Sequence, residues 1–469
     1  MMYYGSTIFL DKGNGAADKI TYHVSSALLP CMSLMEKSGV YLMPGAHETS
    51  GAWKLVVLLT LTATSSYLCR VNISITGALM MPEFGISQIE MGRLFSAFML
   101  GYTLFQVPAG VLADRYGAQR VLFLSALWWV AGSLFIALMG WQSFREVLSN
   151  TVAVLFGMEF LLGVGESPTF PAAGQGVARW VPSSSHGRAN GLVITGVAIG
   201  SALAPLQLSF VMVHWGWPSA IVVSSIPAMI VAIAWSRVRE SSQGTAPAHC
   251  TQSARSIRRF RWSRGFSLLT ISYTLQGYVS FVFVFWFYLY LVQVRHFNMA
   301  RAGILSSLPW ILSIVSIPLG GYLSDRLLST FLGLRWGRRG IPLVALTAAG
   351  ILVVVGARSS GNYAAVACLT LAAALVLCVE GPFWATMMEI AGTSAGTAGG
   401  ILNMGGNIGG IVSPALTPLI AAHFGWQRAL DVAALMACVS ASLWLGVSPS
   451  SPGAGITASR GSRIDTSIE

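Results

Sequence analysis

The sequence predicts an all-α membrane protein with twelve transmembrane helices in two pseudo-symmetric six-helix bundles. Three observations carry this prediction: an apolar composition, a series of apolar segments of membrane-spanning length, and an internal repeat. Of the 469 residues, 54% are hydrophobic and only 10% are charged, whereas about a quarter of a soluble chain is charged. Most of the surface therefore faces lipid, which excludes a disordered protein, a disulfide scaffold and a conventional soluble enzyme.

Apolar segments long enough to cross about 30 Å of hydrocarbon follow one another from residue 53 onward. In lipid, each backbone polar group must be satisfied within its own segment, so these segments are predicted to be helices. The predicted spans are 53–79, 94–111, 121–140, 152–177, 190–213, 217–235, 265–292, 303–322, 341–357, 363–387, 398–422 and 429–447. Residues 1–52 have neither the sustained apolar region nor the clear cleavage site of a signal peptide, and they are predicted to be a flexible cytoplasmic segment.

The arginines indicate which ends of the helices face the cytoplasm. Seventeen of them fall in the loops after even-numbered spans and in the tail, against six on the opposite side. The positive-inside rule then places both termini in the cytoplasm. The basic stretch 237–264 is predicted to be a cytoplasmic linker between the bundles 53–236 and 265–447, and 448–469 a flexible tail. The net charge of +11 therefore marks membrane topology rather than nucleic-acid binding.

The two halves of the sequence repeat one another. The segment GVLADR, which contains Asp114, returns as GYLSDR, which contains Asp325, at an offset of 211. Glu166-Ser-Pro returns as Glu380-Gly-Pro at an offset of 214, and a proline and a Gly-Trp pair both return at an offset of 209. Parallel repeats about an axis along the membrane normal are typical of transporters.

Motifs for nucleotide or metal chemistry are missing from the sequence. No glycine precedes any of the four lysines, which excludes a P-loop. There is no HExxH motif, and the six cysteines form no CxxC pair. We therefore expect no cofactor and no metal, and we expect transport to be driven by a gradient or by a partner protein.

Arg70 is the first candidate for a binding residue. It lies about 26 Å along a helix that begins at residue 53. A cation at that depth is costly unless it faces an aqueous cavity or an anion, and a guanidinium group suits a carboxylate in bidentate geometry. Arg70 is therefore predicted to hold the acidic group of a substrate. The alternative is a structural ion pair with Glu166 or Glu159.

Glu159 and Glu166 are the candidates for proton coupling. They are seven residues apart, which places them two helical turns apart on a similar face. Burial disfavours the charged form of a carboxyl group, so residues of this kind can be protonated reversibly. Glu166 is predicted to be the principal coupling residue. Its alternative role is a packing hydrogen bond beside Pro168.

The turn at residues 110–120 resembles the signature loop of the major facilitator superfamily, and residues 321–326 form a weaker copy. The resemblance implies that Asp114, Arg115 and Arg120, with Asp325 and Arg326 in the copy, act as a cytoplasmic gate latch. The alternative is an ordinary charged turn.

A narrower resemblance rests on motifs in the first, second, fourth, seventh and eleventh spans. These motifs are RVNIS at 70–74, SAF and YTLFQVP within 96–108, GESPTFP at 165–171, WFYLYL at 286–291 and NMGGNIGGIVSP at 403–414. Together they resemble the anion:cation symporter branch, which includes hexuronate and galactonate transporters, sialin and vesicular glutamate transporters. The resemblance implies proton transfer at Glu166 and a substrate cavity lined by Arg70, Asn72, Tyr102, Gln106, Trp286, Tyr290, Asn403 and Asn407.

These observations predict a monomeric, multi-pass transporter of the bacterial inner membrane. It would import a small organic carboxylate together with a proton, or another cation, by alternating access. One alternative is a facilitative uniporter or efflux carrier of the same fold. This alternative is favoured by Cys69, because sugar-acid members of the branch typically have an aspartate at that position, directly before the arginine of the first span. The other alternative is a membrane enzyme or the permease subunit of an ATP-driven complex.

Overall fold

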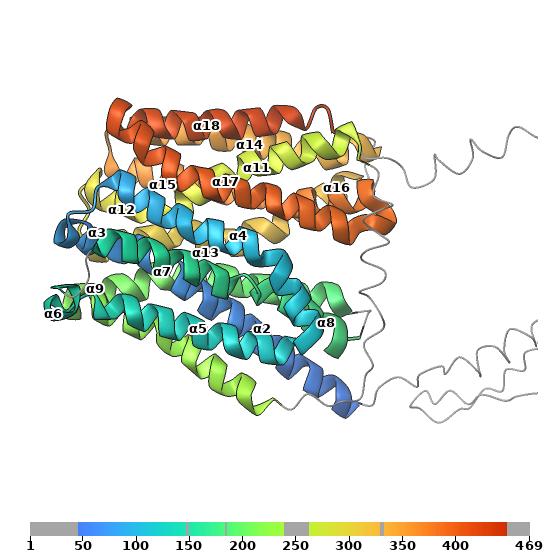
Figure 1. Ribbon diagram of the computed structural model, residues 1–469. Coiled ribbons are helices and arrows are strands. Elements are labelled where there is room, and N and C mark those ends of the chain that lie inside the picture. The colour runs from blue at the N-terminus through green and yellow to red at the C-terminus, as the bar shows by residue number, and fades with distance from the viewer. Residues whose placement is uncertain (1–45, 147–149, 183–184, 239–261, 329–332, 448–469) are drawn as a thin grey trace, which may run out of the picture. The chain divides into compact units, whose positions relative to one another are not determined.

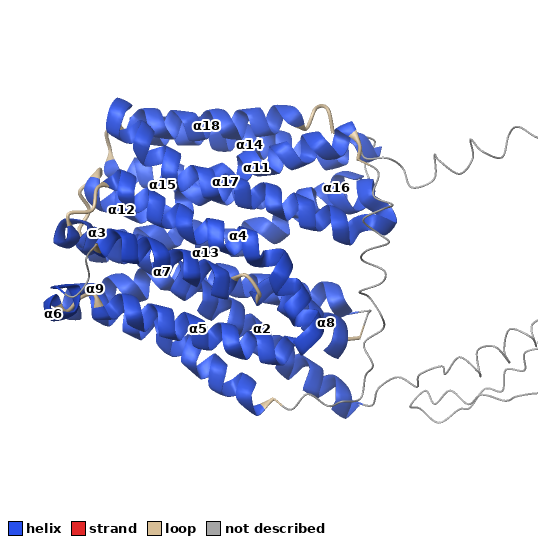
Figure 2. Ribbon diagram, in the orientation of Figure 1, coloured by secondary structure: helices blue, strands red, loops and turns tan. Residues whose placement is uncertain are grey.

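The computed structural model describes residues 46–146, 150–182, 185–238, 262–328 and 333–447. Within these ranges the chain is helical throughout, with short loops and no strand (Figure 2). The described residues from Trp53 onward form one compact unit. Residues 1–45, most of the predicted linker and the predicted tail 448–469 lie outside the described part of the chain.

The helices follow one another along the chain in two series (Figure 1). The first series is α2 (Ala46–Arg70), α3 (Asn72–Phe84), α4 (Gln88–Tyr116), α5 (Ala118–Leu138), α6 (Gln142–Glu146), α7 (Thr151–Glu166), α8 (Thr169–Trp180) and α9 (His186–Arg237). The second series is α11 (Arg264–Phe285), α12 (Phe287–Gln293), α13 (Met299–Leu328), α14 (Gly333–Arg358), α15 (Asn362–Cys378), α16 (Glu380–Ala391), α17 (Ala395–Phe424) and α18 (Trp426–Leu443).

Twelve membrane-spanning helices can be traced in the described residues. Nine helical segments are long and apolar enough to cross a membrane. One of these, α9, is two helices, because Gly216 adopts a φ of 80° that interrupts it and that glycine reaches without steric cost. The helices α17 and α18 complete the set, since even the 18 residues of α18 extend about 27 Å. The predicted all-α class is confirmed, whereas the predicted bundle boundaries stay a prediction.

Four of the spans are interrupted near a polar or aromatic side chain. The first span breaks directly after Arg70, the fourth directly after Glu166, the seventh at Trp286 and the tenth directly before Glu380. These breaks occupy the first and fourth spans of each half, so they follow the internal repeat. Interrupted helices of this kind line the substrate and ion sites of many transporters.

Glycines bring α4 and α7 into backbone contact. A Cβ atom on Gly101 would lie 2.2 Å from a carbonyl oxygen of α7, and one on Gly163 would lie 2.1 Å from a carbonyl oxygen of α4. Only glycine fits at such distances, and small residues allow close helix approach in membranes. Trp129 Nε1 also donates a hydrogen bond to the Gly165 carbonyl at 3.1 Å. These contacts fix the position of the adjoining Glu166.

The two halves of the chain meet along α4 and α17, which lie side by side in Figure 1. A Cβ atom on Gly92 would lie 2.3 Å from the Pro414 carbonyl oxygen. Ser96 Oγ donates a hydrogen bond to the Ile411 carbonyl at 2.7 Å. Gly303, near the start of α13, makes a similarly close contact with α9. The halves are therefore in contact at the end of the unit where α4 begins, which the predicted orientation assigns to the outer side.

Trp286 belongs to this contact between the halves. Pro418 has no N–H group, so the Pro414 carbonyl lacks its usual donor one turn further along α17. Trp286 Nε1 donates to that carbonyl at 3.1 Å, and its ring packs edge-on against Phe95 of α4 with a centroid distance of 5.3 Å. Trp286 is fully buried.

The ninth span begins earlier than the sequence predicts. The prediction starts this span at residue 341 and leaves Arg338 and Arg339 in a loop, but both lie within α14. Arg338 Nη1 lies 2.5 Å from Asp325 Oδ1, and Arg338 Nη2 lies 2.7 Å from Glu389 Oε1. Arg339 Nε donates to a backbone carbonyl at 2.6 Å. Because these partners supply ion pairs and hydrogen bonds to the two guanidinium groups, the side chains of Arg338 and Arg339 can be buried against the neighbouring helices.

Candidate functional site

Arg70 and Glu166 form a buried ion pair between the breaks of the first and fourth spans. Arg70 Nε donates to Glu166 Oε1 at 2.9 Å, and Arg70 Nη2 lies 2.6 Å from the same oxygen. Arg70 is 4% exposed and Glu166 is 2% exposed. The two residues come from helix ends that are 96 positions apart in the sequence. The alternative considered for Arg70, an ion pair with Glu166, is therefore present in this conformation.

Three aromatic rings surround the Arg70 guanidinium. Its Cζ atom lies 4.5 Å from the ring centroids of Tyr67 and Tyr102, and 5.3 Å from that of Phe98. Nη1 also donates a hydrogen bond to the Tyr67 hydroxyl at 3.2 Å. Cation–π contacts stabilise a desolvated guanidinium by about 2 kcal/mol or more. The arginine is thus held by rings on three sides and by one carboxylate.

An amide cluster links the arginine site to the second half of the chain. Gln106 Nε2 donates to the Tyr102 hydroxyl at 3.4 Å, and Gln106 Oε1 accepts hydrogen bonds from Asn403 Nδ2 and Asn407 Nδ2, each at 3.1 Å. Tyr102 and Gln106 are on α4, and the two asparagines are on α17. The structure therefore brings six of the predicted site residues into one connected group: Arg70, Glu166, Tyr102, Gln106, Asn403 and Asn407.

Two other predicted residues are buried but lack this connection. Glu159 is 2% exposed and Asn72 is 1% exposed. Among the described residues, neither Glu159 Oε1 nor Asn72 Nδ2 has a hydrogen-bond partner. A buried polar atom without a partner costs about 1–3 kcal/mol. Both side chains therefore have unused hydrogen-bonding capacity inside the membrane-spanning region.

Glu380 is the repeat counterpart of Glu166, but its surroundings differ. Its Oε2 accepts a hydrogen bond from the Tyr273 hydroxyl at 3.0 Å, and its Oε1 accepts one from Gln276 Nε2 at 3.1 Å. Within the described ranges no basic side chain lies at ion-pair distance from this carboxylate. The pseudo-symmetric positions thus hold an acid paired with a cation in the first half and an acid held by neutral donors in the second.

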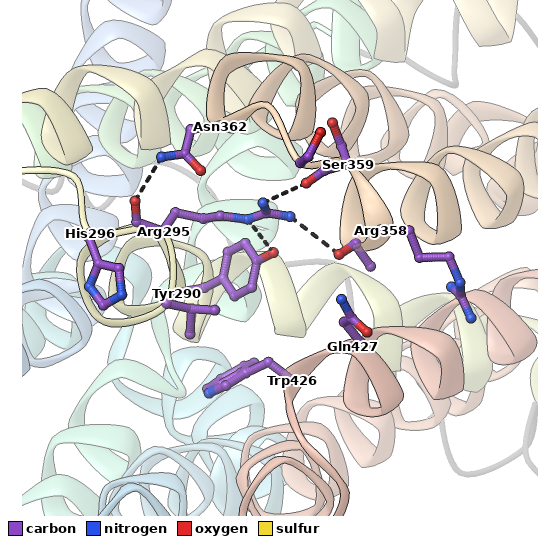
Figure 3. Close-up of a pocket in the computed structure, with 11 residues that line it drawn as sticks. Tyr290, Arg295, His296, Arg358, Ser359, Asn362, Trp426 and Gln427 are labelled. Carbon is purple, nitrogen blue, oxygen red and sulfur yellow. Dashed lines mark hydrogen bonds between the residues drawn. The ribbon is translucent and has the colours of Figure 1, made fainter.

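Trp286 and Tyr290 do not join the Arg70 group. Trp286 lies in the contact between the halves described above. Tyr290 lines a separate pocket, where its hydroxyl accepts a hydrogen bond from Arg295 Nε at 2.8 Å (Figure 3). Their expected place beside the substrate stays a prediction.

The predicted gate residues lie at the end of the unit opposite the contact between α4 and α17. Asp114 Oδ1 accepts a hydrogen bond from Gln175 Nε2 of α8 at 3.1 Å. Arg115 and Arg120 are exposed, and the Arg115 guanidinium lies over the Tyr116 ring at 5.3 Å.

In the repeat copy, Asp325 pairs with Arg338 rather than with a residue of its own motif. Arg326 Nη1 donates to the Tyr322 hydroxyl at 3.4 Å. The two copies of the motif therefore use different partners, an amide in the first and a buried guanidinium in the second.

Sequence reasoning missed several contributors to these clusters. Tyr67 lies one turn before Arg70 on the same helix face, so the spacing alone could have indicated it. Tyr273 and Gln276 come from α11 and reach Glu380 more than 100 residues away. No pattern in a single sequence indicates such a contact.

The interrupted helices, the internal repeat and the buried charge pair define a multi-pass membrane transport protein, not an enzyme. A model of the Major Facilitator Superfamily matches residues 59–414. The chain belongs to this superfamily.

Several similar proteins are named as transporters of particular acid anions. The chain is 28% identical over 411 residues to a probable galactarate/D-glucarate transporter, GudP, of Bacillus subtilis, covering 81% of this chain and 88% of that protein. It is 27% identical over 368 residues to a probable sulfoacetate transporter, SauU, of Cupriavidus necator, covering 74% and 82%. It is 26% identical over 382 residues to a hexuronate transporter of Bacillus subtilis, covering 79% and 88%. These relatives agree with the anion:cation symporter branch that the motifs indicate.

Solved structures agree with the fold. A bacterial homologue of the human lysosomal transporter Spinster, in an inward-facing and occupied conformation, aligns with a TM-score of 0.69 at 16% identity, covering 84% of this chain and 96% of that one. A D-xylose–proton symporter aligns with a TM-score of 0.67 at 15% identity, covering 85% and 98%. At these identities the similarity concerns the fold alone.

Proposed function

We propose that the chain is a proton-coupled symporter that carries a small organic carboxylate anion by alternating access. The observation that supports this proposal is the buried pair of Arg70 and Glu166 at two helix breaks. The relatives described above are named as transporters, two of them probable, of galactarate or D-glucarate, sulfoacetate and hexuronate, all of which are anions of organic acids. A carboxylate is therefore the group that we assign to Arg70.

The ion pair itself supplies a coupling mechanism. A substrate carboxylate that binds the Nε–Nη2 edge of the guanidinium in bidentate geometry must replace Glu166 Oε1, which accepts a hydrogen bond from Nε and lies 2.6 Å from Nη2. Once displaced, the Glu166 carboxylate is buried without a cation, which costs several kcal/mol unless the group is neutralised. Protonation of Glu166 removes that cost. Substrate and proton then bind together. The substrate carboxylate displaces Glu166 from Arg70 and so favours protonation of Glu166, and protonation of Glu166 weakens its hold on Arg70 and so favours substrate binding.

The remaining site residues have distinct roles in this proposal. Tyr102 and the amide cluster of Gln106, Asn403 and Asn407 offer hydrogen bonds to the substrate, with the oxygens of the asparagines as acceptors for hydroxyl groups. Glu159 is a second proton-binding carboxylate. Asp114, Arg115, Arg120, Asp325 and Arg326 form the cytoplasmic latch that opens and closes as the halves rock.

Uptake into proteoliposomes tests the coupling. With radiolabelled D-glucarate and glucuronate as probes, an inwardly directed proton gradient should drive internal substrate above the external concentration. Collapse of the gradient with a protonophore should return it to equality. Uptake that ignores the gradient would support the second candidate, a facilitative uniporter or efflux carrier. That candidate is favoured by Cys69, which is buried directly before Arg70 and supplies no carboxylate there.

A further inference from the structure

A pocket lies away from the Arg70 group, between α12, α14, α15 and α18 (Figure 3). Its volume is about 410 Å³, which falls within the range of small-molecule sites. The lining residues are Tyr290, Val294, Arg295, His296, Ala357, Arg358, Ser359, Ser360, Asn362, Trp426 and Gln427. None of these residues contacts Arg70 or Glu166 through any interaction given above, so the pocket is a separate feature.

The ionisable residues Arg295, Arg358 and His296 that line the pocket are all basic. Two arginines, Arg295 and Arg358, line the pocket with His296, and no acidic residue does. Arg358 is neutralised from outside the pocket, because its Nη1 and Nη2 contact the two carboxylate oxygens of Asp431 at 2.6 and 3.0 Å. Arg295 has no such carboxylate among the described residues.

The partners of Arg295 are neutral groups. Its guanidinium donates to the Tyr290 hydroxyl (Figure 3). It also donates to the carbonyl oxygens of Gly356, Ala357 and Ser359, and the four distances are 2.8 to 3.3 Å. These carbonyls form the C-terminal end of α14, whose dipole offsets about half an elementary charge. A positive charge therefore remains on the pocket wall. It is partly exposed and unmatched within the described part of the chain.

The backbone at the rim is strained. His296 adopts a φ of 56°, the left-handed region that a non-glycine residue rarely occupies. Such a conformation costs on the order of 1–3 kcal/mol and clusters at functional sites. His296 is exposed and lines the pocket beside Arg295.

We propose that this pocket binds an oxyanion group, with Arg295 as the positive charge and Gln427, Asn362 and Ser360 as the surrounding polar groups. Tyr290 and Trp426, whose rings lie 5.8 Å apart, form an aromatic floor for the apolar part of the ligand. Trp426 also packs on Trp286 at 5.6 Å, and Trp286 contacts α4. A bound anion therefore sits directly behind the contact between the two halves. The oxyanion can belong to a soluble organic acid or to a lipid headgroup.

Residue-specific arginine labelling tests the proposal without any transport assay. Purified full-length protein in phosphatidylcholine nanodiscs is treated with phenylglyoxal, with and without sodium acetate or sodium sulfate, and modification of Arg295 and Arg358 is followed by peptide mass spectrometry. At an anion concentration of about twice its Kd, mass action leaves about a third of the sites free, so labelling should slow about threefold. Arg301, an exposed arginine outside the pocket lining, should be labelled at an unchanged rate.

Charge variants separate this site from the proposed substrate site. Gln427→Glu adds a carboxylate to the lining and should abolish the protection, whereas Gln142→Glu, the same change on exposed α6, should preserve it. The double variant Arg70→Ala/Glu166→Ala should preserve it too, which keeps the test independent of the proposed symport.

A further arm identifies the source of the anion. Protection that appears only in phosphatidylglycerol nanodiscs would assign the site to a lipid headgroup, whereas protection by acetate or sulfate assigns it to soluble acids. Labelling of Arg295 and Arg358 that is unaffected by acetate, sulfate and phosphatidylglycerol alike would overturn the proposal.

Discussion

Arg70 contacts a single oxygen of Glu166 with two of its nitrogens, Nε at 2.9 Å and Nη2 at 2.6 Å. Only Nε donates a hydrogen bond to this oxygen, but the oxygen lies at the Nε–Nη2 edge of the guanidinium, where a substrate carboxylate can bind in bidentate geometry. Competition between Glu166 and a substrate carboxylate for Arg70 links binding of the substrate to release of the Glu166 side chain. This linkage depends on the exclusion of water from both Arg70 and Glu166. Their near-complete burial satisfies that requirement.

Glu166→Gln should uncouple transport from the proton gradient. Glutamine cannot be protonated, so proton-driven accumulation should disappear, whereas exchange of internal for external substrate should continue. The measurement compares gradient-driven uptake with counterflow in the same proteoliposomes. Glu146→Gln, the same change on an exposed residue of α6, is the control. Normal accumulation by Glu166→Gln would refute the coupling role.

Arg70→Lys should abolish high-affinity substrate binding even though the positive charge is retained. Lysine lacks the planar fork that holds a carboxylate through two parallel hydrogen bonds. Arg70→Ala leaves the buried Glu166 carboxylate without its cation, which costs about 3–5 kcal/mol. The double variant Arg70→Ala/Glu166→Ala should therefore be more thermostable than Arg70→Ala alone, and equally unable to bind. Wild-type affinity in Arg70→Lys, measured by substrate-induced thermal shift, would contradict this role.

Gln106→Ala should weaken substrate binding without unfolding the protein. The change removes the acceptor that Asn403 and Asn407 share across the two halves. Each such hydrogen bond contributes about 0.5–1.5 kcal/mol, so we expect the apparent affinity to fall about tenfold. Gln142→Ala, on the exposed short helix α6, should leave the affinity unchanged. Equal affinities in both variants would remove the amide cluster from the site.

Gly92→Ala should open the contact between α4 and α17. The new Cβ atom would lie 2.3 Å from the Pro414 carbonyl oxygen, and overpacking of this kind costs about 1–3 kcal/mol. Hydrogen–deuterium exchange of the segments around Gly92 and Pro414 should rise, and transport should slow. Gly157→Ala is a matched control, because nothing lies within 4 Å of its Cβ position. Unchanged exchange in Gly92→Ala would show that the contact tolerates the methyl group.

Trp286→Phe should destabilise the protein, whereas Trp444→Phe should not. Both indoles are fully buried, but only Trp286 Nε1 has an acceptor, the Pro414 carbonyl. Its loss should lower the melting temperature, because a buried carbonyl without a donor costs about 1–3 kcal/mol. Trp444 Nε1 has no partner among the described residues, so its removal should be close to neutral. Similar melting temperatures for the two variants would exclude a special role of the Trp286 bond.

Much of the fold could be predicted from the sequence because the bilayer imposes simple rules on it. Span length, helical structure and the internal repeat follow from apolar runs and recurring motifs. The positions of the breaks could not be predicted, since the chain continues as helix within a residue or two of Arg70 and Glu380. The predicted start of the ninth span, at residue 341, was wrong because hydropathy treats Arg338 and Arg339 as loop residues, whereas both lie within α14. Their buried partners become visible only in three dimensions.

The candidate site was predictable in part for the same reason. An arginine inside an apolar span is conspicuous, and so is a glutamate beside a proline, so Arg70 and Glu166 could be identified singly. The amide contacts of Gln106 with α17 required the two halves to be placed together, and no sequence spacing encodes that placement. Tyr290 is assigned to the substrate cavity by its motif alone, and that assignment stays a prediction; the structure shows that Tyr290 lines the pocket beside Arg295.

The separation of 96 residues between Arg70 and Glu166 also affects how the protein is made. At a ribosomal rate of about 5–20 residues per second, roughly 5–20 s pass between the synthesis of the arginine and that of its partner. During that interval a nascent hydrophobic segment carries an uncompensated cation. An arginine at the centre of a membrane helix costs about 2.5–3.5 kcal/mol on insertion, and the arrival of the fourth segment supplies the carboxylate that offsets this cost. The pair that we propose for coupling therefore also affects how the first segment settles in the bilayer.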